Sequence, residues 1–257
     1  MMAAALAGNH TFENAEALAQ GVAGWLCGLA RAKDGTFAVS LSGGSTPRRL
    51  YELLATPEIK SQFPWSRTHW FWGDERFVPH DSRDSNYGMA RDAFLSRVPA
   101  PTDNVHAIPT EGLSPEQAAA AYEATLKRFY GTDRLSPDRP LFDVTLLGVG
   151  ENGHTASLFP GAPALQETRR WVAAVVGANS PPRITLTYPA LDSSQDIAFV
   201  VTGKEKREVV ARARAGDRTI PAGLVRPVGR LHWFTDRAAA EADEAEAKEA
   251  EATEGAK

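Results

Sequence analysis

Short apolar runs alternate with segments of helical periodicity along most of the chain, and this alternation constrains the fold more than any other feature. Several runs are apolar at consecutive positions, as strands that have helices on both faces must be. Strands alternating with helices indicate an α/β fold with a largely parallel sheet. The expected strands are residues 36–44, 68–76, 142–150, 171–177, 183–187, 196–203 and 230–236.

The intervening segments carry start and stop signals of helices. Residues 114–131 begin with Ser-Pro and end in Gly, and Pro47 stands where the first turn of another helix should begin. Residues 14–32 and 203–216 have the same helical character. We expect one α/β domain over residues 1–240.

The charge is concentrated at the C-terminal end. Residues 237–257 hold seven acidic and three basic side chains, which account for the whole net charge of −4. The remainder is formally neutral and offers no broad basic surface for nucleic acid, so any anion that it binds must be small. Residues 241–257 form an Ala/Glu-rich acidic tail, expected to be helical or disordered.

Cysteine use and hydropathy bear on the compartment. Cys27 is the single cysteine of the 257 residues and has no partner in the chain for a disulfide, which favours a reducing compartment. The first residues lack the basic start and long apolar stretch of a signal peptide, and no window approaches the ~18 apolar residues of a membrane span. We expect a cytoplasmic protein with no membrane partner.

The segment "SLSGGSTPRRL" (40–50) is the first candidate binding site. A strand runs into Gly43 and Gly44, the hydroxyls of Ser45 and Thr46 follow, and a helix begins. Glycines let the backbone approach an anion, and free N–H groups at a helix start attract it. The segment therefore predicts a phosphate site; the alternative is a tight turn with a capping Ser or Thr.

The segment "WGDERFVPHDSRDSNYG" (72–88) is the second. Asp74, Glu75 and Arg76 directly follow the end of an apolar strand, where open α/β sheets place their ligands. A surface turn held by ion pairs is the alternative interpretation.

The segment "LLGVGENGHTASLFPG" (146–161) is the third. His154 follows a buried strand and lies among glycines, a position typical of a general base. His69 and His232 lie within strand patterns and suggest core roles, and His106 is expected in a loop. No histidine pairs with Cys or His at metal-ligand spacing, so no metal site is expected.

Two cations follow in later segments. Arg183 begins the strand "RITLT", and Lys206 lies in the first turn of the helix after "VVTG". A cation at a helix start opposes the dipole and suggests an anionic ligand, although a solvated lysine is the simpler interpretation.

Together, "LSGGSTP", "GDERFVP" with "SNYG", "LGVGENGHTASLFPG", "RITLT" and "GKEK" resemble the 6-phosphogluconolactonases, in the same order and over roughly residues 12–240. The resemblance implies a three-layer αβα domain of the glucosamine-6-phosphate deaminase and ribose-5-phosphate isomerase type. It implies hydrolysis of 6-phospho-D-glucono-1,5-lactone in the oxidative pentose phosphate pathway, with no metal or organic cofactor and a monomeric or homodimeric state.

The same resemblance implies roles for single residues. His154 is similar to the base that activates water, and Arg76 to the cation that stabilises the oxyanion. Asp74 is similar to a further carboxylate of the site. The phosphate-binding set is Gly43, Gly44, Ser45, Thr46, Arg183 and Lys206.

The chain departs from the family pattern at one position. The family usually has Asp-Gly-His, where the carboxylate orients the imidazole and steadies its cation, whereas this chain has Asn152. An Asn carbonyl can accept the ring N–H but cannot offset the charge. Glu151 replacing the carboxylate, or an easy reaction that tolerates Asn, are the interpretations we favour over reduced activity.

Two other functions remain open on the same fold. An amino-sugar-phosphate deaminase or isomerase would need a ring-opening carboxylate, yet "GHTASL" continues with Phe159 and Pro160. A non-catalytic sugar-phosphate sensor would usually carry a DNA-binding segment, of which the composition gives no sign.

Overall fold

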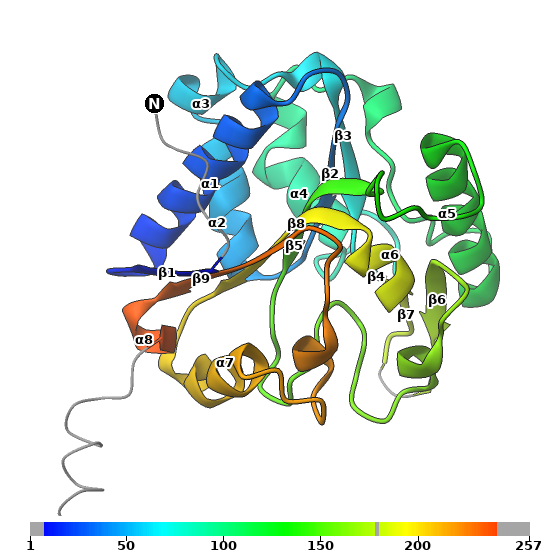
Figure 1. The fold of residues 1–257 in the computed structure, drawn as a ribbon. Coiled ribbons are helices and arrows are strands. Elements are labelled where there is room, and N and C mark those ends of the chain that lie inside the picture. The colour runs from blue at the N-terminus through cyan, green and yellow to red at the C-terminus, as the bar shows by residue number, and fades with distance from the viewer. Residues whose placement is uncertain (1–7, 178–179, 241–257) are drawn as a thin grey trace, which may run out of the picture.

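The computed structural model describes residues 8–177 and 180–240. A six-stranded, all-parallel sheet forms its centre, with the strand order β1-β9-β8-β5-β2-β3 (Figure 1). The strands are β1 (Gly8–Phe12), β2 (Phe37–Leu41), β3 (Thr68–Trp72), β5 (Phe142–Leu147), β8 (Ser194–Val201) and β9 (Arg230–Asp236). The expected α/β class and mostly parallel sheet are confirmed.

Helices cover both faces of this sheet, which makes the three layers. Figure 1 shows α1 (Ala15–Ala32) and α2 (Ser45–Leu54) on one face and α7 (Arg207–Arg214) on the other. The expected helix at 203–216 begins later, because residues 204–206 form a 3₁₀ turn. The remaining helices are α3 (Pro57–Lys60), α4 (Asn86–Ala93), α5 (Pro115–Tyr130), α6 (Tyr188–Asp192) and α8 (Arg237–Ala240).

The ends of α5 follow from its sequence. Ser114 and Gln117 form a reciprocal capping box at its start, and Gly131 ends it with a left-handed φ of 83°. Ala118, Tyr122 and Leu126 recur on one side of the helix and are buried there.

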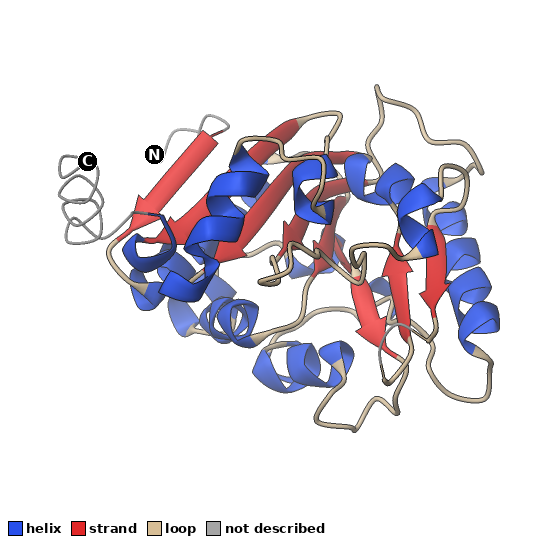
Figure 2. Ribbon diagram, turned by 90° about the horizontal axis from the view of Figure 1, so that it is seen from below, coloured by secondary structure: helices blue, strands red, loops and turns tan. Residues whose placement is uncertain are grey.

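A second, antiparallel sheet stands apart from the large one (Figure 2). Its order is β4-β7-β6, with β4 (Asp74–Arg76), β6 (Val172–Val175) and β7 (Arg183–Leu186). The run 68–76, expected as one strand, is therefore two strands in different sheets. The sequence predicts a buried strand at residues 171–177, but Ala173 and Ala174 at the centre of β6 are only half-buried.

Strand β1 and helix α4 were not expected from the sequence. The β1 sequence GNHTF has no apolar run, and it is a strand because it pairs in parallel with β9 along the edge of the large sheet. Helix α4 is short, and Ser85 caps it by accepting the N–H of Gly88.

The direction of the chain across the large sheet reverses between β2 and β5. After β2 the chain moves outward to β3, whereas after β5 it moves the other way to β8. The loops that leave the carboxyl ends of β2 and β5 diverge at such a point and leave a crevice for a ligand. Trp70 and Trp72 of β3 and Phe142 of β5 are buried in the core.

The acidic tail, residues 241–257, lies outside the described residues. Within the ranges 8–177 and 180–240, no helix has both the length and the apolar character needed to cross a bilayer.

Candidate active site

A pocket of about 480 Å³ opens at the switch point of the large sheet. Its wall is formed by the loops after β2 and β5, by β4 and α4, by the start of β7, and by the turn before α7. The lining residues are Ser42, Gly43, Gly44, Asp74, Arg76, Asn86, Gly148, Val149, Gly150, His154, Ala156, Phe159, Arg183 and Lys206.

Positions 43 and 44, after β2, require glycine for two different reasons, a close neighbour and a positive φ. A Cβ on Gly43 would lie 1.9 Å from Oδ1 of Asn86, and Gly44 has a φ of 108°. Gly44 is also the N-cap of α2 and no side chain caps this helix, so the alternative of a capping Ser or Thr is wrong. The first N–H groups of a helix without such a cap are suited to an anion.

The hydroxyl residues of this loop do not line the pocket wall itself. Ser45 is exposed at the first position of α2, and Thr46 forms a hydroxyl–hydroxyl hydrogen bond of 2.8 Å with Thr202. That bond joins the first turn of α2 to the residue after β8, close to the turn that carries Lys206.

The two carboxylates of β4 are buried, with exposed fractions of 8% for Asp74 and 1% for Glu75. The alternative of a surface ion-pair turn is therefore wrong. Glu75 accepts the N–H groups of Asn86 at 2.7 Å and Tyr87 at 2.8 Å, and so it fixes the start of α4. Burial raises the pKa of Glu75, and these N–H bonds oppose the rise.

Asp74 is the carboxylate of β4 that faces the pocket. Its Oδ2 accepts a hydrogen bond of 2.6 Å from the hydroxyl of Ser157, and its Oδ1 accepts a longer one of 3.4 Å from Asn86. The next side chain toward the pocket, Arg76, donates to the carbonyl of Asp84 at 2.6 Å.

The imidazole of His154 is oriented by Asn152. Nδ1 of the ring lies 2.6 Å from Oδ1 of Asn152, and because that oxygen can only accept, Nδ1 carries the proton. Nε2 is then the basic nitrogen. The ring of Phe159 lies beside the imidazole, with 4.7 Å between ring centroids.

The surroundings of His154 favour its neutral form. Burial is the largest cause that lowers its pKa below the usual 6.5. Asp74 raises the pKa, while Lys206 and Arg183 lower it further. The imidazole is therefore uncharged near neutral pH and available as a base.

Two guanidinium groups and one ammonium group line the pocket. Arg76 and Arg183 occupy directly opposed positions of β4 and β7. Like charges in such a pair are unfavourable unless an anion lies between them. Burial and the neighbouring Arg76 lower the pKa of Arg183, and its Nε has no hydrogen-bond partner.

Lys206 reaches the pocket from the 3₁₀ turn before α7. Its Nζ lies 3.9 Å from Oε1 of Glu151, whose side chain is 72% exposed. Glu151 is thus paired with the lysine, and the hydrogen-bonding position at Nδ1 of His154 belongs to Asn152.

The structure thus brings seven of the predicted site residues to one pocket: Gly43, Gly44, Asp74, Arg76, His154, Arg183 and Lys206. Four lie just behind or beside its wall: Ser45, Thr46, Glu151 and Asn152. Sequence reasoning did not assign roles to Ser42, Asn86 or Ser157, although all three stand in the quoted motifs.

The other histidines have structural partners. His232 is fully buried in β9 and lies 2.8 Å from Asp196, as the core interpretation predicted. His106 lies in a loop, as expected, with its Nε2 3.0 Å from Nδ1 of His69 on β3. Among the described residues, no three His, Cys, Asp or Glu side chains are grouped so that they could hold a metal ion.

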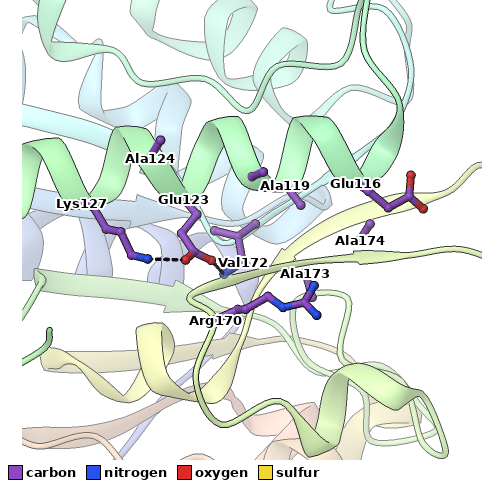
Figure 3. Close-up of a pocket in the computed structure, with 10 residues that line it drawn as sticks. Glu116, Ala119, Glu123, Ala124, Lys127, Arg170, Val172, Ala173 and Ala174 are labelled. Atoms are coloured by element: carbon purple, nitrogen blue, oxygen red, sulfur yellow. Dashed lines mark hydrogen bonds and ion pairs between the residues drawn. The ribbon is translucent and has the colours of Figure 1, made fainter. Parts of the chain in front are cut away.

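A second pocket, of about 330 Å³, lies between α5 and β6 (Figure 3). Its wall is largely alanine, with Glu123 and Lys127 paired at 2.6 Å. It contains no histidine and none of the predicted site residues, so the pocket at the switch point is the candidate active site.

Comparison with known proteins agrees with this geometry. The sequence model of the family described as glucosamine-6-phosphate isomerases/6-phosphogluconolactonase matches residues 13–233. The chain belongs to this family. Within it, a 6-phosphogluconolactonase of Nostoc sp. is 43% identical over 210 residues, which cover 80% of this chain and 85% of the relative.

Solved structures of the same family share the fold. The 6-phosphogluconolactonase from Trypanosoma cruzi has a TM-score of 0.80 at 28% identity, covering 93% of this chain and 97% of that chain. A monomeric glucosamine-6-phosphate deaminase has a TM-score of 0.74 at 21% identity, covering 90% and 98%. The fold relation to the deaminases is thereby confirmed, and the residues of the pocket must distinguish the two activities.

Proposed function

We propose that this chain is a 6-phosphogluconolactonase, which hydrolyses 6-phospho-D-glucono-1,5-lactone to 6-phospho-D-gluconate in the oxidative pentose phosphate pathway. The observation that carries the proposal is a neutral, oriented imidazole with Phe159 beside it in a pocket lined by three cations. A lactone ester needs little more than a base for water and a cation for the oxyanion.

In the first step, Nε2 of His154 takes a proton from a water molecule, whose oxygen attacks the lactone carbonyl carbon. The carbonyl oxygen becomes an oxyanion, and Arg76 is the cation that we assign to it. The imidazolium keeps its Nδ1–H on Asn152 throughout. A base of this kind contributes roughly 10²–10⁴ in rate.

In the second step, the tetrahedral intermediate collapses and the bond from the carbonyl carbon to the ring oxygen breaks. The ring oxygen leaves as the hydroxyl of the open-chain acid after it accepts the proton held on Nε2. His154 returns to its neutral form, and one water molecule has been added across the ester.

The phosphate lies away from the reacting carbon and serves to position it. We assign its binding to Gly43, Gly44, Ser45 and Thr46 at the start of α2, with Arg183 and Lys206. Binding energy from such a remote group is converted into orientation at the reacting centre. Lys206 would then leave its ion pair with Glu151 and bind the phosphate instead.

Phe159 argues against the deaminase alternative. In the related deaminases, the sequence after Gly-His carries a catalytic carboxylate, whereas here the apolar ring of Phe159 lies against the imidazole. An apolar ring can neither donate nor accept a proton for the opening of a sugar ring.

The deciding experiment compares lactone hydrolysis by the wild type and His154→Ala with the spontaneous rate. Fresh lactone is generated in the cuvette, and the product is coupled to 6-phosphogluconate dehydrogenase. We expect the wild type to exceed the background and the folded variant to fall to it. Ammonia release from glucosamine 6-phosphate, with no gain over the background for the lactone, would replace this proposal by the deaminase alternative.

We also propose the cytoplasm as the compartment. The support is Cys27, the only cysteine of the chain, which is buried as a free thiol on α1.

A further inference from the structure

The turn that follows His154 is tied to the carboxylate of β4. Ser157 is fully buried, and its hydroxyl donates to Oδ2 of Asp74 at 2.6 Å. Its main-chain N–H donates to the hydroxyl of Thr185 at 3.1 Å. The preceding residue, Ala156, has a φ of 46°, a strained conformation for a residue with a Cβ. Such strain persists only where surrounding contacts fix the backbone, as these two hydrogen bonds do.

Asp74 is held from both sides by neutral donors. Ser157 binds one carboxylate oxygen, and Asn86 binds the main-chain oxygen at 2.9 Å and the other carboxylate oxygen at 3.4 Å. Neutral donors fix a carboxylate without cancelling its charge. Asp74 therefore presents a fixed negative charge to the pocket that it shares with His154.

The reaction requires such a charge, because His154 becomes an imidazolium after it takes the proton of water. Asn152 orients the ring but is uncharged. We propose that Asp74, positioned by Ser157, supplies the negative charge that steadies the His154 imidazolium, while Asn152 supplies only the orientation. This inference rests on the proposed function, in which His154 is the base.

The other charges around the imidazole do not fill this role. Lys206 from the turn before α7, Arg183 from β7 and Arg76 from β4 face the same pocket and all disfavour an imidazolium. Glu151, on the loop of His154 itself, points to Lys206 and is largely exposed, so water screens its charge. Asp74 is the buried carboxylate of the pocket wall.

An NMR titration of the His154 ring tests the inference without substrate. Asp74→Asn should lower the pKa of His154 by about one unit, as the loss of a nearby opposite charge does. Glu151→Gln removes the same charge from the same loop region and is the matched control, expected to shift the pKa by less than about 0.3 units because it is solvent-screened. The inference is overturned if Asp74→Asn leaves the titration unchanged or if Glu151→Gln shifts it as much.

A double variant that moves the carboxylate from position 74 to position 152 gives a sharper test. Asn152→Asp restores a carboxylate at the imidazole, so in the Asp74→Asn background it should return the pKa of His154 toward the wild-type value and recover most of the lost kcat. If the double variant instead keeps the lowered His154 pKa and the lowered kcat of Asp74→Asn, the inference is overturned, because Asp74 then acts on something other than the charge of the imidazolium.

Ser157→Ala is the second variant, useful if Asp74→Asn does not fold. We expect kcat to fall by about tenfold with KM within about twofold, because a positioning residue affects the reacting state more than binding. The acid limb of the kcat profile should move together with the His154 titration. A purely structural role would lower the melting temperature and leave that limb in place.

The two proposals can fail separately. A folded wild type that does not accelerate lactone hydrolysis would overturn the proposed function, even with the expected titration shifts. An active enzyme in which Asp74→Asn leaves the pKa of His154 unchanged would overturn only the further inference.

Discussion

The ring of His154 lies directly over Gly150, three residues after the end of β5. A Cβ on Gly150 would be 2.0 Å from Cε1 and 2.1 Å from Nδ1 of the imidazole, distances that no real side chain tolerates. The main chain also closes here, because Gly150 N–H donates to the carbonyl of His154 at 2.9 Å. Gly150 thus sets both the place and the tilt of the ring.

Gly150→Ala should therefore abolish most activity while leaving the fold intact. The methyl group pushes the imidazole off Asn152, and a misplacement of about 1 Å can cost on the order of 10²-fold in rate. Gly148→Ala adds the same methyl group to the same loop with nothing within 4 Å, and it should cost far less. Steady-state kinetics and near-UV circular dichroism of the two variants check this, and equal losses would contradict it.

Most of the charged residues and glycines of the pocket were predictable from sequence because they follow the end of an apolar run, as Gly43, Asp74 and His154 do. Which partner each side chain contacts was not predictable. Asn152 accepts a hydrogen bond from Nδ1–H and Glu151 turns to Lys206 because of a glycine-rich loop whose course depends on contacts from distant segments. One such contact is the N–H of Ala222 on the carbonyl of Gly153, at 2.9 Å.

Among the elements, α5 shields the edge strand β6 of the small sheet (Figure 3). Oε2 of Glu123 accepts the N–H groups of Trp171 at 3.0 Å and Val172 at 3.2 Å, while Oε1 pairs with Lys127. A helix carboxylate thus satisfies donors that a further strand would otherwise bind.

Glu123→Ala should destabilise the protein by about 1–3 kcal/mol, because two N–H groups of buried residues lose their acceptor. Lys127→Ala breaks the partly exposed ion pair and a cation–π contact of 5.6 Å with Trp171, and it should cost about 1 kcal/mol or less. Urea unfolding of both variants gives the comparison. A larger loss for Lys127→Ala would show that the ion pair matters more than the strand donors.

Two titratable histidines lie together at the edge of the large sheet, His69 on β3 and His106 on the loop beside it. Burial, followed by the charge of His69, lowers the pKa of His106 to about 4, and burial also lowers the pKa of His69. The unfolded chain binds these protons near pH 6.5, and the folded chain does not. Stability should accordingly be complete above pH 6.5 and decline as the pH falls from 6.5 toward 4.

His106→Gln should flatten that decline. Since His106 is only half-buried, solvent screening reduces its share to about 1 kcal/mol between pH 7 and pH 5. Melting temperatures of the wild type and the variant across this range measure the difference. An unchanged slope would mean that other groups cause the acid sensitivity.

Which strands form was clearer from the sequence than how they pair. Consecutive apolar residues marked β2, β5 and β8 as buried, and helices of the expected type lie between the strands. The same pattern could not separate β6 and β7 from the large sheet, because a short apolar run looks alike in either sheet. The GNHTF segment of β1 becomes a strand only through its neighbour β9.

At the scale of the whole molecule, the net charge and the candidate active site belong to different parts of the sequence. Every residue lining the candidate active site falls between Ser42 and Lys206, and the acidic tail begins at residue 241. We predict that deleting residues 241–257 keeps kcat/KM within about twofold, because the residues that line the candidate active site all belong to the rest of the chain. The comparison is made on the purified full-length and shortened chains, and a loss greater than about tenfold would refute it.

The pairing of β1 with β9 has a consequence for synthesis. Residues 8–12 leave the ribosome well before the strand that they join, which ends at residue 236. At about 5–20 residues per second, that partner emerges roughly 10–50 seconds later. Strand β1 must wait for that time before it can pair, so its addition to the edge of the large sheet is a late step of assembly.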